Sequence, residues 1–270
     1  MATAAAVKPS HEVVTRGEWL KARKDLLVRE KAATRERDEI ARLRRELPWV
    51  RVEEEYIFDG ENGTVKLADL FDGRSQLVVY HFMFDPAWSQ GCKSCSLVAD
   101  HYNPAVIHLA HRDVSMVTVS RAPLEKIAAF KRRMGWSFRW VSSNGNTFNR
   151  DFQVSFDEGE RTSGLPVYNF STIPFPISEA PGLSVFTKGE NGDIFHTYST
   201  YARGLDIFLG VFQLLDCVPK GRDEEDIPIM SWVRHHDRYD GRPFVDPWDE
   251  PAAQAGDKAN GQVLPSCGCT

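Results

Sequence analysis

Residues 80–95 read Tyr-His-Phe-Met-Phe-Asp-Pro-Ala-Trp-Ser-Gln-Gly-Cys-Lys-Ser-Cys, and this stretch decides the fold. It overlaps the apolar run 77–84, whose length and content of β-branched and aromatic residues predict a buried strand. Asp85-Pro86 ends that strand, and after a short loop Cys92-x-x-Cys95 leads into a segment suited to begin a helix. A Cys-x-x-Cys motif in the order strand, loop, motif, helix indicates redox chemistry.

The two cysteines have the spacing that thiol redox chemistry needs. The thiolate is the reactive form of cysteine, and we expect a helix N-terminus and the neighbouring Lys93 to stabilise it at Cys92. A spacing of three places Cys95 on the same helix face, within reach of a disulfide. We therefore predict that Cys92 is the nucleophile and Cys95 the resolving thiol. The alternatives are a chance motif or half of a zinc site, although no second Cys-x-x-Cys exists to complete one.

Residues 85–101 resemble the active-site segment of the thioredoxin-like superfamily. They are most similar to the bacterial thioredoxin-like family called domain of unknown function 899. Further similarity lies in residues 181–186 and 195–206, and the resemblance runs from the first predicted helix to about residue 237. It implies an α/β, thioredoxin-like fold with an N-terminal helical extension and a C-terminal tail. The chain departs from ordinary thioredoxins, because Trp does not directly precede Cys92 and Ser94 stands where they usually have Pro.

Pro181 is a candidate active-site residue by its position in this resemblance. In thioredoxin-like proteins a cis proline precedes the strand that faces the cysteine pair, and Ala180-Pro181 comes just before the apolar residues 183–186. A cis bond there would turn a backbone edge toward the site, where a substrate strand can pair with it. We predict a cis bond at Pro181; the alternative is an ordinary trans turn proline.

Other side chains near the motif are candidates for support. We expect Trp88 to shield the disulfide or stack on a substrate, and Asp85 to accept a proton during exchange. His101 and His196 are weaker candidates, and a structural role is the alternative for all four.

Three further cysteines complete the set of five. Cys217 closes an apolar segment, so we predict that it is buried and unreactive. Cys267-Gly-Cys269 is a candidate second redox pair that would exchange electrons with the first, with a reduced, exposed tail as the alternative.

Composition narrows the class of protein. The chain has 270 residues, of which 42% are hydrophobic and 26% charged, with a formal net charge of −5. No basic field favours nucleic acid or an anionic membrane, and no apolar run approaches the roughly 20 residues that span a bilayer. The N-terminus lacks the features of a signal peptide, and an odd number of clustered cysteines does not suggest a secreted disulfide framework. We expect a cytoplasmic protein with working or free thiols.

The sequence predicts three regions: a helical extension (1–48), a thioredoxin-like domain (49–218) and a C-terminal extension with a partly disordered tail (219–270). Thr15-x-x-Glu18 is a capping box that begins one or two charged helices ending before Pro48. Their mixed charges favour a solvated amphipathic helix packed on the domain, or on a second subunit in a homodimer, over nucleic-acid binding.

Alternating strands and helices predict a parallel sheet core. Residues 49–73 resemble the entry to a peroxiredoxin-type thioredoxin fold, with a hairpin, although the Cys-x-x-Cys motif departs from peroxiredoxins. The remaining predictions are strands at 113–120 and 138–142, a helix at 123–134, a closing hairpin from 183–186 and 193–198, and a last helix at 205–215. No element is predicted for residues 144–180.

The leading functional hypothesis is a thiol–disulfide oxidoreductase that acts on a protein or small-molecule disulfide. It needs no organic cofactor, but an external thiol reductant must regenerate the dithiol. One alternative is a copper or zinc carrier that uses Cys92, Cys95 and a histidine such as His196, because thiolates and imidazole suit both metals. Another is a scaffold or dimerisation protein with a vestigial cysteine pair.

Overall fold

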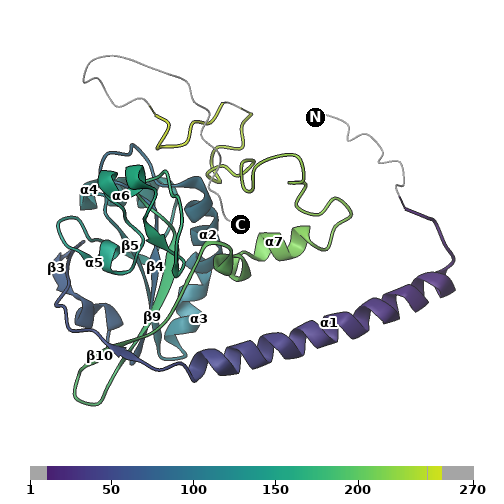
Figure 1. Cartoon of the computed structure of the whole chain (residues 1–270), viewed down its shortest axis with the longest axis horizontal. Helices are drawn as coiled ribbons and strands as arrows, with labels where there is room; N and C mark the ends of the chain where they lie inside the picture. The colour runs from purple at the N-terminus through teal and green to yellow at the C-terminus, as the bar shows by residue number, and fades with distance from the viewer. Residues whose placement is uncertain (1–10, 242, 251–270) are drawn as a thin grey trace. The chain divides into compact units, whose positions relative to one another are not determined.

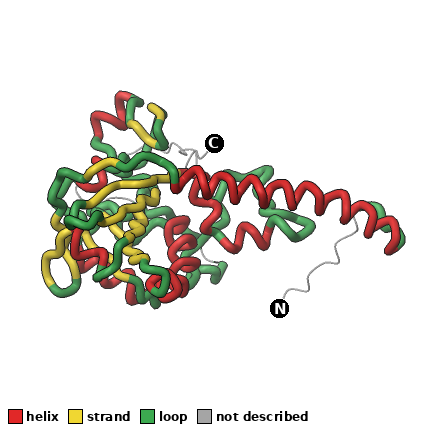
Figure 2. Tube along the Cα trace, turned by 90° about the horizontal axis from the view of Figure 1, so that it is seen from below, coloured by secondary structure: helices red, strands yellow, loops and turns green. Residues whose placement is uncertain are grey.

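The computed structural model describes residues 11–241 and 243–250, in two compact units, Met1–Pro48 and Trp49–Thr270. The first unit contains one uninterrupted helix, α1 (Arg16–Arg45), which Figure 2 shows in red. The predicted capping box is confirmed, because the Glu18 N–H donates to Thr15 Oγ1 and the Thr15 N–H donates to the Glu18 carboxylate. No side chain of α1 is buried.

The second unit is built on an eight-stranded sheet in the order β1-β10-β9-β4-β5-β6-β2-β3. Figure 1 labels β3, β4, β5, β9 and β10 of this sheet. Its strands are β1 (Val50–Arg51), β2 (Ile57–Gly60), β3 (Gly63–Lys66), β4 (Gln76–His81), β5 (Val114–Ser120), β6 (Arg139–Ser142), β9 (Gly182–Lys188) and β10 (Ile194–Tyr201). Strands β7 (Val167–Tyr168) and β8 (Ser171–Thr172) form a separate pair. Strands β4, β5 and β6 run parallel, whereas β9 is antiparallel to β4 and β10 to β9. The order β5-β4-β9-β10 confirms the predicted α/β, thioredoxin-like fold.

Short helices connect these strands. They are α2 (Lys93–Tyr102), α3 (Val106–Ala110), α4 (Leu124–Arg133), α5 (Phe148–Asp151), α6 (Glu158–Ser163) and α7 (Gly210–Leu215), with 3-10 turns η1 (Leu67–Phe71), η2 (Asn103–Ala105) and η3 (Ala202–Phe208). The predicted last helix, 205–215, is wrong as one element, because Leu209 leaves the helical region with φ −100° and ψ 87°. Gly210 packs there against the His101 ring, where a Cβ would come within 3.3 Å.

Two apolar clusters lie on opposite faces of the sheet, as the alternation along β4 requires. Leu77 and Val79 belong to the cluster with η1 and α5. Tyr80 belongs to the cluster with α2 and α4, which also contains Cys92 and Cys95. The cysteine pair is therefore part of a packed core at the end of a central strand.

The C-terminal segment from Pro219 to Glu250 belongs to the same unit as the sheet. Trp232 and Trp248 pack against the cluster that holds the cysteines, so part of this segment packs on the domain. Cys217 is exposed, so the prediction of a buried thiol is wrong: α7 ends at Leu215, and the Cys217 thiol donates to Gln213 O at the surface. Cys267, Cys269 and most of the predicted disordered tail lie outside the described residues.

Within the described ranges, no helix is both long and apolar enough to cross a bilayer.

Candidate functional site

Cys92 caps the N-terminus of α2 in a backbone arrangement that the preceding loop determines. Its N–H donates to Met83 O over 3.1 Å, and its carbonyl accepts from the Ser96 N–H and hydroxyl. Glycine at position 91 allows this close packing, because a Cβ there would lie 2.6 Å from a Phe82 ring atom. The loop therefore fixes where the first thiol stands relative to the helix.

The two thiols are buried and are not joined in a disulfide, and their pKa values shift in opposite directions. Cys92 is 2% exposed and Cys95 1%. A hydrogen bond from the Cys95 thiol lowers the pKa of Cys92, helped by the N–H groups of Cys95 and Ser94 at the helix start. Burial raises the pKa of Cys95, and its hydrogen bond to Cys92 adds to the effect. Cys92 is thus the group that ionises first, as an attacking thiol must.

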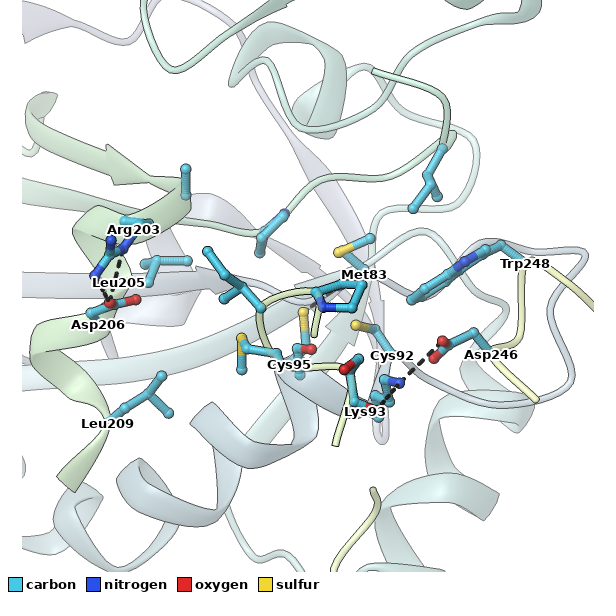
Figure 3. Close-up of a pocket in the computed structure, with 18 of the residues that line it drawn as sticks. Met83, Cys92, Lys93, Cys95, Arg203, Leu205, Asp206, Leu209, Asp246 and Trp248 are labelled. Carbon is cyan, nitrogen blue, oxygen red and sulfur yellow. Dashed lines mark hydrogen bonds and ion pairs between the residues drawn. The ribbon is translucent and has the colours of Figure 1, made fainter. Parts of the chain in front are cut away.

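The pair forms the floor of a pocket of about 240 Å³. Figure 3 shows Asp246 and Trp248 on one side of the cysteines and Leu205, Asp206 and Leu209 on the other. The segment from Pro228 to Ser231 contributes further lining, so a part of the chain far from the motif in sequence builds the pocket.

Lys93 lies beside Cys92 but is held by other partners. Its Nζ is 3.1 Å from Asp246 Oδ2 and donates to Ser231 O over 3.3 Å, with only 7% of the residue exposed. The Asp246 carboxylate acts against a Cys92 thiolate and raises the pKa of Cys92. The Lys93 ammonium that was expected to stabilise the Cys92 thiolate is therefore paired with the Asp246 carboxylate, a partner that the sequence did not predict.

Two buried polar groups of the pocket lining stand out beside the dithiol, Tyr80 and Asp246. The Tyr80 hydroxyl has only the Cys95 sulfur as a hydrogen-bond partner, and Asp246 Oδ1 has none among the described residues. Burial raises the pKa of each group, and the Cys95 and Cys92 sulfurs add to the effect at Tyr80. Buried polar atoms are almost always hydrogen-bonded, so the free Asp246 oxygen calls for an explanation, and a bound ligand would supply one.

Pro181 lines the pocket with the cysteines, but the prediction of a cis bond is wrong. No cis peptide bond occurs in the described part of the chain. The chain enters β9 in extended form, with the Ala180 N–H donating to Val154 O and Pro181 O accepting from the Tyr168 hydroxyl. A trans X-Pro bond, the lower-energy form, satisfies both contacts.

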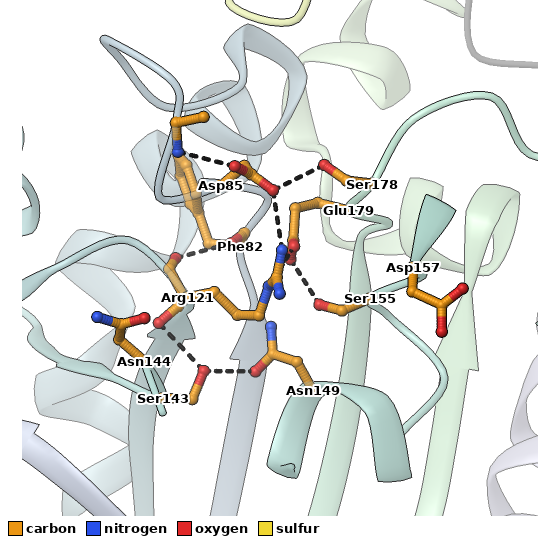
Figure 4. A network of polar contacts seen from close by, with 12 residues as sticks. Phe82, Asp85, Arg121, Ser143, Asn144, Asn149, Ser155, Asp157, Ser178 and Glu179 are labelled. Atoms are coloured by element: carbon orange, nitrogen blue, oxygen red, sulfur yellow. Dashed lines mark hydrogen bonds and ion pairs between the residues drawn. The ribbon is translucent and has the colours of Figure 1, made fainter. Parts of the chain in front are cut away.

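Trp88 and Asp85 do not line the pocket. The Trp88 ring lies 5.4 Å from the ring of Trp248, which does, so Trp88 supports the wall from behind. Asp85 belongs to a separate polar network around Arg121 (Figure 4). Arg121 donates to Asp85 Oδ2 over 2.8 Å and to Glu179 Oε1 over 2.6 Å.

The candidate histidines have structural partners. His101 accepts from the Val211 N–H and joins α2 to α7, while His196 bonds Ser199 on β10 and does not line the pocket. Residues 11–241 and 243–250 contain no group of three or more His, Cys, Asp or Glu side chains arranged to hold a metal ion. His196, the histidine named for a copper or zinc carrier, is therefore not placed with the cysteine pair.

The sequence did not place the C-terminal wall at the cysteine pair or identify its anchor, His235. This side chain is fully buried, with Nε2 bonded to Gly91 O over 2.8 Å, directly before Cys92. Burial lowers the pKa of His235 to about 4, so it serves as a neutral tether. In the sequence, His235-His236-Asp237 favours surface or capping roles, which is wrong for the buried His235, while Trp232 and Trp248 indicate only that the segment packs on the domain.

Comparison with solved structures finds proteins of low similarity to this chain. A peroxidoxin, BcpB, from Mycobacterium tuberculosis is 15% identical, covers 62% of this chain and 97% of its own, and has a TM-score of 0.41. A PrxQ mutant from Xylella fastidiosa is 13% identical, covers 62% and 94%, and has a TM-score of 0.40. A hypothetical protein from Sinorhizobium meliloti is 11% identical, covers 55% and 68%, and has a TM-score of 0.35.

No curated protein sequence matches the chain. A family model described as bacterial protein of unknown function (DUF899) matches residues 8–239, which include the cysteine pair and most of the pocket lining. The chain therefore belongs to the DUF899 family.

Proposed function

We propose that the protein is a thiol–disulfide oxidoreductase in which Cys92 attacks and Cys95 resolves. The observation that carries this proposal is the hydrogen-bonded dithiol at the start of α2, which lowers the pKa of Cys92 and raises that of Cys95. A pair of inert structural thiols would have no need of this difference, nor of a pocket directly above the sulfurs.

The reaction needs only the two thiols and a substrate disulfide. The Cys92 thiolate attacks one sulfur, the substrate S–S bond breaks, and the departing thiolate takes up a proton. Cys95 then loses its proton and attacks the Cys92 sulfur, which releases the second substrate thiol. The protein loses two electrons and forms the Cys92–Cys95 disulfide, and an external thiol reductant restores the dithiol without an organic cofactor.

The surrounding residues would act by position. Pro181 lines the same pocket as the two cysteines, and Trp88 braces Trp248, which also lines it. Lys93, paired with Asp246, would hold the C-terminal wall against α2 rather than serve as a free cation. Asp85 would act at a distance, by fixing the loop between β4 and Cys92.

The test is to trap the intermediate in a Cys95→Ser variant, which cannot resolve a mixed disulfide. With a low-molecular-weight disulfide, mass spectrometry should find one substrate thiol bound to Cys92, while the native protein should instead form the internal disulfide. Cys217→Ser is the matched control, since that thiol is exposed and outside the pocket. Modification of Cys217 with Cys92 left free would contradict the assignment.

A further inference from the structure

The pocket above the dithiol has features that select a class of substrate, an inference that rests on the proposed thiol–disulfide exchange. Its lining is mainly apolar, its two cationic side chains each pair with a carboxylate, and it holds a buried carboxylate oxygen that has no hydrogen-bond partner among the described residues. We propose that the substrate is a small, uncharged, apolar disulfide that carries an amide group, rather than a protein disulfide or a charged peptide disulfide.

The volume of the pocket limits the size of the substrate. Both sulfurs are almost fully buried at the pocket floor, so a substrate S–S bond must enter the pocket to meet Cys92 in line. The volume of about 240 Å³ exceeds the roughly 150 Å³ of an engineered cavity that binds benzene. It lies below the ~300 Å³ at which drug-sized sites begin. A five- or six-membered ring with a short chain is therefore the right scale, whereas a folded protein loop is not.

The walls of the pocket are mainly apolar. The side chains that face the pocket include Ile177, Leu205, Leu209, Ile229, Met230 and Trp248. Contact with such walls stabilises apolar groups, because it removes their surface from water. A hydrocarbon part next to the disulfide would therefore bind favourably.

The charged side chains of the lining disfavour an anionic substrate. Lys93 pairs with Asp246, and Arg203 lies 3.2 Å from Asp206, so neither cation is left without a carboxylate partner. Asp249 adds a further carboxylate to the lining. A substrate carboxylate would enter an apolar, slightly acidic pocket without a partner, which is costly. This disfavours glutathione disulfide and other anionic substrates.

One carboxylate oxygen of the pocket lining has no hydrogen-bond partner among the described residues. Asp246 Oδ1 can accept a hydrogen bond, and Asp246 lines the pocket with the two cysteines. A substrate amide offers an N–H that can donate to this oxygen, and the amide carries no charge. Binding it would satisfy an atom that otherwise remains buried without a partner.

The experiment compares disulfides in a single turnover of the fully reduced, full-length protein, with oxidation of Cys92 and Cys95 followed by thiol trapping. The probes are lipoamide, which is a cyclic disulfide with a neutral amide, lipoic acid with the same ring and a carboxylate, glutathione disulfide, and insulin as a protein disulfide. We expect lipoamide to oxidise the pair at least about tenfold faster than any of the other three, because a carboxylate must be desolvated without a partner.

A pair of variants two residues apart tests whether the pocket causes this preference. Ile229 lines the pocket, and Ile227 does not and is 41% exposed. Ile229→Lys should bring lipoic acid to at least the rate of lipoamide, because the ammonium can pair with its carboxylate, whereas Ile227→Lys should keep the native order.

The outcomes are distinguishable. Faster oxidation by insulin or glutathione disulfide than by lipoamide would overturn the substrate class but keep the oxidoreductase. Equal rates for lipoamide and lipoic acid in the native protein would also overturn it. If no disulfide oxidises the pair, the proposed function itself fails, and the substrate class with it.

Discussion

Two clusters of buried polar residues, the Arg121 network and the lining of the dithiol pocket, differ in whether all their carboxylate oxygens have hydrogen-bond partners. In the Arg121 network every carboxylate oxygen is bonded: those of Asp85 accept from Arg121, Ser178 and the Ala87 N–H, and those of Glu179 accept from Arg121 and Ser155. At the dithiol pocket, Asp246 Oδ1 has no partner among the described residues.

This difference separates a structural role from a chemical one. A fully bonded network gains nothing from a ligand, and it fixes the loop that leads to Cys92. A free buried oxygen lowers stability unless a ligand donates a hydrogen bond to it, so its presence beside the thiols favours binding there. Both groups contain acids with pKa values shifted by burial, so shifted pKa values alone would not have separated the two.

The largest expected effect is on stability, and it tests the structural role of the network. Arg121→Met leaves Glu179, which is 1% exposed, without its cation, and should lower the free energy of unfolding by about 3 kcal/mol at neutral pH. The matched control is Arg150→Met, whose partners Asp157 and Glu160 are on the surface, with an expected loss below about 1 kcal/mol. Denaturant unfolding measures both. Similar losses in the two variants would remove the distinction.

The second prediction concerns pH. Burial raises the pKa of Glu179 to about 7 from an ordinary value near 4.5. Between these values the folded protein holds a proton that the unfolded chain releases, so this group makes stability fall as pH rises from about 4.5 to 7. Glu179→Gln should remove that contribution, and unfolding of both proteins at pH 5 and pH 7.5 checks it. The exposed Glu158→Gln should keep the native slope; a slope unchanged in Glu179→Gln would contradict the assignment.

The smallest effect sharpens the account of the pocket. Asp246→Asn removes the carboxylate that raises the pKa of Cys92 and frees the Lys93 ammonium beside it. Both changes favour the thiolate, so the pKa of Cys92 should fall and its alkylation below neutral pH should become faster. The control is Asp249→Asn, another carboxylate of the lining. Slower alkylation in Asp246→Asn would mean that the carboxylate serves Cys92 as a proton acceptor instead.

Local patterns were sufficient to predict the framework. The apolar run before Asp85 became β4, the closing hairpin became β9 and β10, and the capping box at Thr15 began α1. Each of these depends on residues that are close in sequence, so periodicity and turn signals identify it. The Cys-x-x-Cys motif belongs to this class, because its strand and helix are its neighbours.

The rest of the site depends on contacts over long distances in sequence. Nothing near Lys93 predicts that Asp246 neutralises it, and nothing near Gly91 predicts its bond to His235. The polar segment from Pro219 onward carries little periodicity, so although Trp232 and Trp248 indicate that it packs on the domain, its place at the dithiol became visible only in three dimensions. The cis bond at Pro181 was inferred from position alone, and the backbone contacts on either side decided otherwise.

The central claim is that Cys92 and Cys95 form a working redox pair, and a redox titration of the full-length protein tests it most directly. The protein is equilibrated with buffers of a dithiol and its disulfide, free thiols are trapped at each potential, and peptides are mapped by mass spectrometry. The account predicts one reversible two-electron transition in which Cys92 and Cys95 become linked while Cys217 stays free. Loss of the two thiols at different potentials, or a stable link from Cys92 to any other cysteine, would contradict it.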